Sequence, residues 1–470
     1  MQAPASTAPA PAPGGPVPVT YVPRLGLFSG TMAVIGGIIG SGIFLNPAIV
    51  AARVGTAPLT LLAWVLGGVV AILGAFIYGE LAARVPRVGG GYAYLRDAFG
   101  PFPAFLYAWA LLLMVATGAI AAVAFTFASY AGALFGLPER VLPWLAGGAI
   151  AVLSALNYVG VKPAAWTQNV LTLLKLGALA VLIAAGLFLP VAAPAPSPGA
   201  APLPVPVGFG AIALALATAF VPVLFSYGGW QQTNFIAEEL VEPERNLPKA
   251  LVLGVTGVIA VYLLANVAYL RVLGVTGLAA STAPAADTMT AVLGSRGRTF
   301  ISLGILASTF GFLDLVIMVS PRVYQAMAAD GLFFESFARL HPRFRTPVTA
   351  TTAQGVWACL LIASQSYGKL LDWVTFADWI FFGATAATLI VHRRRDRAAG
   401  AALSTRPPVG FRLPGYPVTL GVFLLASGYV VAGSISSHPG NAVRGSLLLA
   451  LGVLVYFWWD ARRRSRGRAG

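Results

Sequence analysis

The hydrophobic positions of this chain fall into long runs, each about as long as a helix needs to be to cross a bilayer. A membrane-spanning helix takes roughly 20 consecutive apolar residues. Short loops with charged residues or prolines separate the runs. The pattern predicts an all-α polytopic membrane protein with about 12 transmembrane helices. The predicted spans are residues 25–52, 58–82, 101–136, 141–158, 165–188, 209–238, 247–271, 298–327, 348–366, 370–392, 414–434 and 444–460.

Two of these spans are interrupted in the middle. Residues 36–42 (GGIIGSG) interrupt the first, and residues 225–230 (FSYGGW) interrupt the sixth. Glycine costs about 1 kcal/mol relative to alanine in a helix interior, and unpaired backbone groups are tolerated at membrane depth only where they face protein or a cavity. Close helix packing through small residues would explain either break alone. Two breaks at corresponding places in two halves indicate a transporter binding site.

Composition and charge narrow the class. Hydrophobic residues make up 58% of the chain and charged residues only 10%, whereas soluble domains carry about 25% charged residues. The net charge of +15 does not indicate nucleic-acid binding, because the basic residues lie in short loops and at the C-terminus, as the positive-inside rule describes. The loop charges predict a multi-pass protein of the cell membrane with both termini cytoplasmic.

This orientation predicts an internal symmetry. Spans one to five begin inside and spans six to ten begin outside, and each set opens with a broken span, which is typical of a five-plus-five inverted repeat. The predicted divisions are a disordered cytoplasmic tail (1–23), a first repeat (24–188), an extracellular Pro-rich linker (189–208), a second repeat (209–392), a basic cytoplasmic loop (393–413), two further helices (414–460) and a basic cytoplasmic tail (461–470).

The polarity of the half-helices predicts the ligand. The second half of span one begins near Ser41 with free N–H groups and the positive end of its dipole, which favour a carboxylate. The first half ends near Ile38, and the outer half of span six ends near Phe225 and Ser226, with carbonyls that attract an ammonium group. This combination suits a zwitterionic α-amino acid. Its side chain is expected to meet Phe225, Tyr227 and Trp230.

Lys175 lies close to the middle of span five. It is about ten residues from the inner end of the span, or roughly 15 Å at 1.5 Å per residue, in a hydrocarbon core about 30 Å thick. A lysine there costs at least about 2.5 kcal/mol on insertion scales, so we expect it to face the bundle interior. One interpretation is a static strut, satisfied by the carbonyls at the break of span one; a role in transport is the other.

Several motifs resemble one known family. Residues 37–44 (GIIGSGIF) resemble the first-helix signature of the amino acid–polyamine–organocation superfamily. Residues 225–230, with Glu238, Glu239 and the later RNLP motif (245–248), resemble the sixth helix of its L-type amino acid transporter branch. Residues 79–81, 89–95, 99–101, 320–322, 327–331 and 341–342 also fit that branch. The resemblance covers roughly residues 25 to 460. It implies a LeuT-type fold with helices 1 and 6 broken and sodium-independent alternating-access transport of L-amino acids, neutral ones expected.

The resemblance also implies roles for single residues. Ile38, Gly40, Ser41 and Gly42 would hold the carboxylate and part of the amino group. Phe225, Ser226 and Gly228 would complete the ammonium site, with Phe225 also acting as a lid, Gln231 would tune selectivity, and Trp230 stays in the expected side-chain pocket. Lys175 would stand where related sodium-dependent carriers bind an ion, with a role in coupling.

Two carboxylates depart from the family pattern. Asp314 and Asp378 stand where related animal proteins often carry asparagine. An ionisable residue at membrane depth is by default a functional hypothesis, so either could favour a cationic substrate or carry a proton in coupling and gating. A solvated or hydrogen-bonded carboxylate near a helix mouth is the alternative.

The sequence also bears on other functions and on partners. A cationic amino acid or polyamine carrier is the alternative to a neutral amino acid carrier, by exchange or proton coupling. An amine-sensing receptor or channel is more remote, since no span shows a sustained polar stripe. No catalytic constellation, cofactor motif or metal-ligand spacing is visible, which predicts no enzyme, no cofactor and no metal. The single cysteine, Cys359, and the cysteine-free loop 136–140 predict no disulfide-linked heavy subunit.

Overall fold

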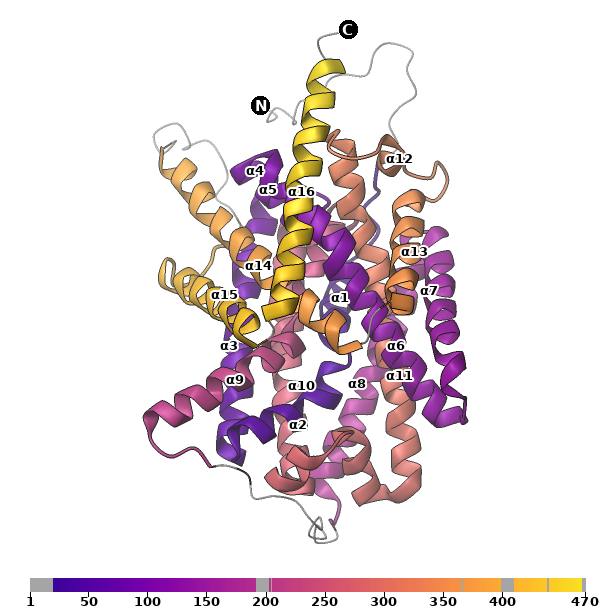
Figure 1. Ribbon diagram of the computed structural model, residues 1–470, viewed down its shortest axis with the longest axis vertical. Coiled ribbons are helices and arrows are strands. Elements are labelled where there is room, and N and C mark those ends of the chain that lie inside the picture. The colour runs from indigo at the N-terminus through magenta and orange to yellow at the C-terminus, as the bar shows by residue number, and fades with distance from the viewer. Residues whose placement is uncertain are drawn as a thin grey trace.

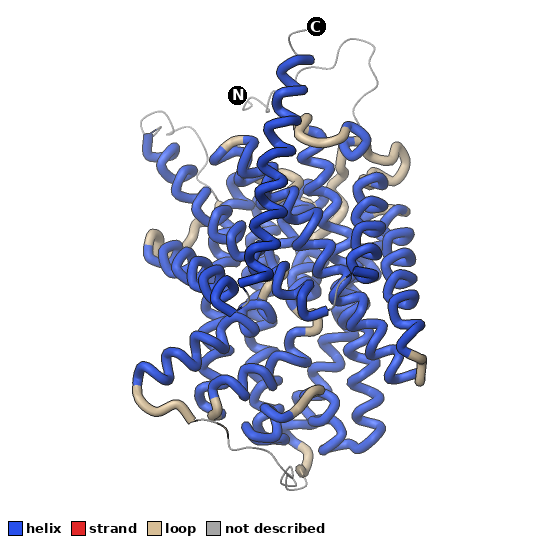
Figure 2. The backbone as a smooth tube through the Cα atoms, in the orientation of Figure 1, coloured by secondary structure: helices blue, strands red, loops and turns tan. Residues whose placement is uncertain are grey.

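The computed structural model describes residues 20–191, 203, 205–364, 367–398, 410–437 and 439–466. Helices make up nearly all of this part of the chain, and most of the long ones run roughly along the longest axis (Figure 1, Figure 2). Its β-structure is limited to one isolated parallel bridge between Leu25 and Leu240. The predicted all-α class is therefore confirmed for the described residues.

The first half of the chain contributes the helices of the first five predicted spans. They are α1 (Leu27–Ile38), α2 (Gly42–Val54), α3 (Ala57–Arg84), α4 (Gly91–Phe99), α5 (Pro101–Ala110), η1 (Leu111–Val115), α6 (Ala116–Phe135), η2 (Glu139–Val141), α7 (Leu142–Tyr158) and α8 (Val161–Phe188). Gly136, with φ of 66°, ends α6 in the left-handed conformation that glycine adopts without strain. Elements α5, η1 and α6 together form the long third span.

The second half contributes the remaining helices. They are α9 (Phe209–Tyr227), η3 (Trp230–Glu239), α10 (Pro243–Ala280), α11 (Pro284–Ala329), α12 (Glu335–Ala338), α13 (Val348–Ser364), α14 (Tyr367–Ala398), α15 (Val418–Ser437) and α16 (Pro439–Arg466). The two halves interlock, because α3 packs against α10 and α8 packs against α11.

Nine helices in the described part of the chain are long and apolar enough to cross a membrane, or ten if the bent pair α1–α2 is one span. The chain is thus a multi-pass membrane protein. The ninth predicted span is a shorter apolar helix of 17 residues, α13. The tenth lies in α14, where the side chains of residues 367–376 are outside the described set. The count of twelve spans stays a prediction.

Much of the predicted tail and linker lies outside the described residues, namely 1–19 and most of 192–204. The end of the predicted disordered tail differs from expectation, because Tyr21 is buried against the helices. Its ring lies 6.0 Å from the Arg322 guanidinium carbon, and its hydroxyl lies 3.5 Å from Oε1 of Gln325. Next to it, the backbone N–H groups of Arg24 and Leu25 donate to the Glu239 carbonyl. The chain is thus anchored before α1 begins.

A buried ion pair lies directly beneath this anchor. Nε of Arg322 in α11 donates to Oε1 of Glu239 at the end of η3, at 2.9 Å, and the two side chains are 1% and 2% exposed. The pair joins α11 of the second half to the end of η3, which follows the break after α9. A buried charge that loses its partner is strongly unfavourable, so the pair holds η3 in register with α11.

We expect Glu239→Ala to destabilise the folded protein by about 3–5 kcal/mol, because it leaves the Arg322 guanidinium buried without its counter-charge. The measurement is thermal unfolding of the detergent-solubilised protein. Glu335→Ala is the matched control, because it removes an ion pair at the surface. The side chains of that pair, Glu335 and Arg339, are 86% and 75% exposed. The double replacement Glu239→Leu with Arg322→Met should cost less than Glu239→Ala. A single-variant melting temperature equal to that of the control would contradict this account.

Candidate functional site

The break between α1 and α2 is a sharp bend in otherwise apolar structure. The two helices meet at 42°. Ile39 leaves the helical region with φ −77° and ψ 86°. Ser41 then stands at the N-cap of α2, and its side chain makes no capping hydrogen bond. The first N–H groups of a helix have no intrahelical partner, so the start of α2 presents free donors and the positive end of its dipole.

The second break lies between α9 and η3. α9 ends at Tyr227, Gly228 is extended, and Gly229 has φ of 104°, a conformation that favours glycine. A Cβ at Gly229 would overlap the carbonyl oxygen of Gly37. The two breaks therefore touch each other through backbone atoms. Position 229 therefore requires glycine, because the backbone there has a positive φ and because a side chain would overlap Gly37.

The ammonium of Lys175 closes one side of the first break. It is fully buried, and Nζ donates to the carbonyl oxygens of Gly36 at 3.1 Å and Ile39 at 2.7 Å. The hydroxyl of Ser308 in α11 lies 3.1 Å from the same Ile39 oxygen and 3.0 Å from that of Gly40. The prediction that Lys175 faces the interior is confirmed. The carbonyls at the end of α1 are therefore bound largely by the protein itself.

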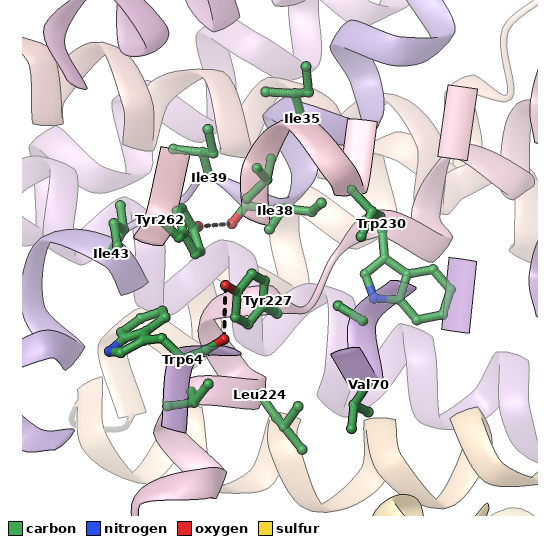
Figure 3. Close-up of a cluster of buried hydrophobic side chains, with 14 of the residues drawn as sticks. Ile35, Ile38, Ile39, Ile43, Trp64, Val70, Leu224, Tyr227, Trp230 and Tyr262 are labelled. Atoms are coloured by element: carbon green, nitrogen blue, oxygen red, sulfur yellow. Dashed lines mark hydrogen bonds between the residues drawn. The ribbon is translucent and has the colours of Figure 1, made fainter. Parts of the chain in front are cut away.

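A tyrosine that the sequence analysis did not single out joins the two breaks. The hydroxyl of Tyr262 in α10 lies 3.1 Å from the carbonyl oxygen of Ile38 (Figure 3). It also lies 3.1 Å from the carbonyl oxygen of Ser226. A hydroxyl has one proton to donate, so it satisfies one of these carbonyls at a time. Tyr262 is fully buried within an apolar span, and its neighbours give no signal of which helix it meets.

Side chains of α2 also attach that helix to α9. Nδ2 of Asn46 donates to the carbonyl of Pro222 at 3.0 Å and to Oγ of Ser226 at 2.8 Å. The Arg53 guanidinium donates to the carbonyl of Thr218 one turn further out. The sequence does contain a signal for this contact, because Asn46 lies inside an apolar span and polar side chains often join membrane helices.

A cavity of about 70 Å³ lies where the two breaks meet. Its wall includes nine of the residues predicted for the site: Ile38, Gly40, Ser41, Gly42, Phe225, Ser226, Gly228, Gln231 and Asp378. The rest of the wall is mostly apolar, and much of it comes from η1, α6, α11 and α14. It includes Val115, Ala116, Ala119, Val123, Phe312, Trp379 and Phe382.

The structure does not place Trp230 in this wall. Its ring packs edge-on against Tyr78, with centroids 4.8 Å apart, and also contacts Phe382 and Phe423. Figure 3 shows it on the far side of the break from Tyr262. The reason is Gly229, whose positive φ turns the chain so that the next side chain enters the groove at Gly74. Tyr227 also turns away, and its hydroxyl donates to the Trp64 carbonyl.

The two unusual carboxylates occupy different places. Asp314 is fully buried outside the cavity wall, and its Oδ1 accepts a hydrogen bond from Nδ2 of Asn157 at 3.1 Å. The carboxyl group of Asp314 is therefore buried and hydrogen-bonded, and it is not exposed to solvent. Asp378 lines the cavity. Lys175 also lies outside the wall, behind the carbonyls of α1.

A site made from the ends of broken helices inside a bundle of membrane-spanning helices, with donors on one side and carbonyls on the other, is typical of a carrier for small solutes. Residues 25–458 match the amino acid permease family, and the chain belongs to it. It is a transporter of that family and not an enzyme.

Two human relatives illustrate the match. The chain is 32% identical over 438 residues to the b(0,+)-type amino acid transporter 1 of Homo sapiens, covering 92% of this chain and 87% of that protein. It is 31% identical over 438 residues to the human large neutral amino acids transporter small subunit 2, covering 92% and 80%.

We expect Gly42→Ala to abolish transport, because a Cβ there would lie 2.9 Å from the Cα of Ser226 and 2.7 Å from its Oγ, which forces the two broken helices apart. The measurement is uptake of radiolabelled alanine by proteoliposomes. Gly257→Ala in α10 is the matched control, since nothing lies within 4 Å of its added Cβ. Transport by Gly42→Ala at the rate of this control would refute the close contact.

Proposed function

We propose that this chain carries L-amino acids, small neutral ones foremost, across the cell membrane by alternating access and without sodium. The observation that carries the proposal is the cavity at the two helix breaks. The start of α2 favours a carboxylate there, and the carbonyls of Ile38 and Ser226, which share one hydroxyl proton from Tyr262, leave an acceptor for an ammonium group. The residues proposed to bind the backbone of the substrate are Ile38, Gly40, Ser41, Gly42, Phe225, Ser226 and Gly228.

The size of the cavity supports a small substrate. A cavity needs roughly 10–15 Å³ in this measure to hold one water, so 70 Å³ holds about five or six waters, close to the six non-hydrogen atoms of alanine. Phe225 and Gln231 border the same space, and we propose them as the lid and as a selectivity residue. Larger amino acids require the wall to open further.

The proposed mechanism uses the two halves as an inverted repeat. The fold we propose is LeuT-type, with twelve spans, repeats at 24–188 and 209–392, and two further helices at 414–460. Both termini are then cytoplasmic, as the loop charges favour. Substrate at the breaks would face each side in turn as one repeat moves against the other.

The contacts of Lys175 support sodium independence. Carbonyl oxygens at a broken helix are typical ligands for a sodium ion, but here the carbonyls of Gly36 and Ile39 already accept hydrogen bonds from the lysine ammonium. A fixed positive charge at this place opposes binding of a second cation. Exchange and proton coupling both operate without sodium. Measurements of counterflow exchange and of uptake under a proton gradient distinguish the two mechanisms.

The partner proposed is the amino acid alone, without a disulfide-linked heavy subunit. One relative is named a small subunit, which concerns that protein. In this chain the loop 136–140 carries no cysteine, and Cys359 lies partly buried in α13. Non-reducing electrophoresis of protein from its native membrane tests this point, and a band that shifts on reduction would contradict it.

We expect proteoliposomes to take up alanine at the same rate when sodium is replaced by choline, because the cation position is occupied by Lys175. Proteoliposomes that contain unlabelled alanine should take up labelled alanine by exchange. If the rate of this exchange does not change with pH, the result favours an obligate exchanger. Acceleration by an inward proton gradient that is lost in Lys175→Ala would favour proton symport. Strict dependence on sodium would overturn the proposed role of Lys175, and absence of any amino acid uptake would overturn the proposed function.

We expect Ser41→Ala to weaken alanine binding by about 1–3 kcal/mol. The lower value is the net contribution of one hydrogen bond, and the upper value applies to a hydrogen bond with a charged acceptor such as the substrate carboxylate. Isothermal titration of the purified protein measures this change. Ser295→Ala, at an exposed residue outside the cavity wall, is the control for the same chemical change. Unchanged affinity in Ser41→Ala would remove this hydroxyl from the proposed site.

A further inference from the structure

Asp378 differs from the other carboxylates in the interior of the described bundle. Three of those have partners at hydrogen-bonding distance: Glu80 with Arg84 and Arg393, Glu239 with Arg322, and Asp314 with Asn157. Asp378 faces the cavity, and no residue that the structure describes makes a hydrogen bond or ion pair with its carboxyl group. Among the carboxyl groups compared here, it is the one that the described residues leave open to a partner from the cavity.

The surroundings of Asp378 contain no compensating charge. The titratable groups that face it from neighbouring elements are Tyr78 of α3 and Tyr107 of α5, both neutral phenols. Within the described residues, α6 and α15 carry no charged side chain, and the charged residues Arg96 and Asp97 of α4 form ion pairs with Asp330 and Arg395. The charged residues of α16 lie near its two ends, at Arg444 and from Asp460 onward. Beside it on α14, Trp379 and Phe382 complete an aromatic wall. An ionised carboxylate in such a place is unfavourable unless a cation pairs with it.

The position of Asp378 assigns it to the side-chain end of the substrate. The two poles of the amino acid backbone are proposed to lie at the start of α2 and at the carbonyls of Ile38 and Ser226. The wall that remains for a side chain comes mainly from η1, α6, α11 and α14, through residues such as Val115, Phe312 and Asp378. Asp378 is the ionisable side chain in this part of the wall, so a charged group on the substrate side chain would meet its carboxyl group there.

We propose that Asp378 sets the charge of the side chain that the cavity accepts. With a neutral amino acid bound, the carboxyl group carries a proton. With an amino acid whose side chain ends in an ammonium group, the proton leaves to solvent and the carboxylate pairs with that cation. The selectivity between cationic and neutral substrates then rises with pH. This inference rests on the proposed amino acid site, which it extends to a second substrate class.

The experiment compares two competitors of nearly equal shape against alanine uptake by proteoliposomes. Norvaline has a methyl group where 2,4-diaminobutyrate has an ammonium group, and the latter keeps its positive side chain between pH 5.5 and 7.5. In the wild type, the inhibition constant of 2,4-diaminobutyrate relative to norvaline should fall at least tenfold over this range. In Asp378→Asn the ratio should not change with pH, and at pH 7.5 it should be at least tenfold higher than in the wild type.

Two further variants complete the design. Asp378→Glu keeps a carboxyl group and should keep the pH dependence of the ratio. Glu139→Gln makes the same change from carboxyl to amide at an exposed residue outside the cavity and should behave as the wild type. The wild-type profile decides by itself if Asp378→Asn does not fold, since a pH-invariant ratio there overturns the inference. The same pH dependence in Asp378→Asn as in the wild type also overturns it.

The failure of this inference can be told apart from failure of the proposed function. A pH-invariant ratio with intact alanine uptake contradicts only the role of Asp378. Absence of alanine uptake in the wild type contradicts the amino acid site itself, and with it this inference.

Discussion

The contact between the two broken helices is the constraint on which the rest of this structure depends. The carbonyl of Gly37 meets the backbone of Gly229, and any side chain at position 229 would overlap it. Two helices that end in the middle of a bilayer leave backbone groups without intrahelical partners, which are tolerated only when buried in protein or facing a cavity. By meeting there, the two breaks share their donors and acceptors, and Lys175, Ser308 and Tyr262 bind much of what remains.

The same constraint explains why the site is made mostly of backbone. Glycine at the breaks lets α1, α2 and α9 approach closely, and Gly42 does so against Ser226. The polar groups left over are those of the first turn of α2 and part of the carbonyls at the ends of α1 and α9. They form the poles of the cavity, while apolar side chains from α6, α11 and α14 complete it. Lys175 lies behind the break and supports it without entering the cavity.

The sequence predicted the breaks and the backbone of the site well, because glycines inside apolar spans are costly and therefore informative. It misplaced Trp230, since the turn at Gly229 decides which way the next side chain points and sequence spacing does not reveal a positive φ. It also missed Tyr262 and Asn46. A polar residue in an apolar span signals an interior position, but its partner depends on how helices far apart in the chain pack together. Asp378 stood out as a carboxylate at depth, and its place in the cavity wall distinguishes it from Asp314, which lies outside the wall and accepts a hydrogen bond from Asn157.

The central claim is that the breaks bind both ends of a zwitterion. Competition against alanine uptake by proteoliposomes tests it most directly, with ethylamine and propionate as the two halves of alanine. Each pole contributes its full interaction only when the other holds the molecule in place. The account predicts that unlabelled alanine suppresses uptake while ethylamine and propionate, alone or mixed at the same concentration, leave it unchanged. Inhibition by either half as strong as that by alanine would contradict a two-pole site.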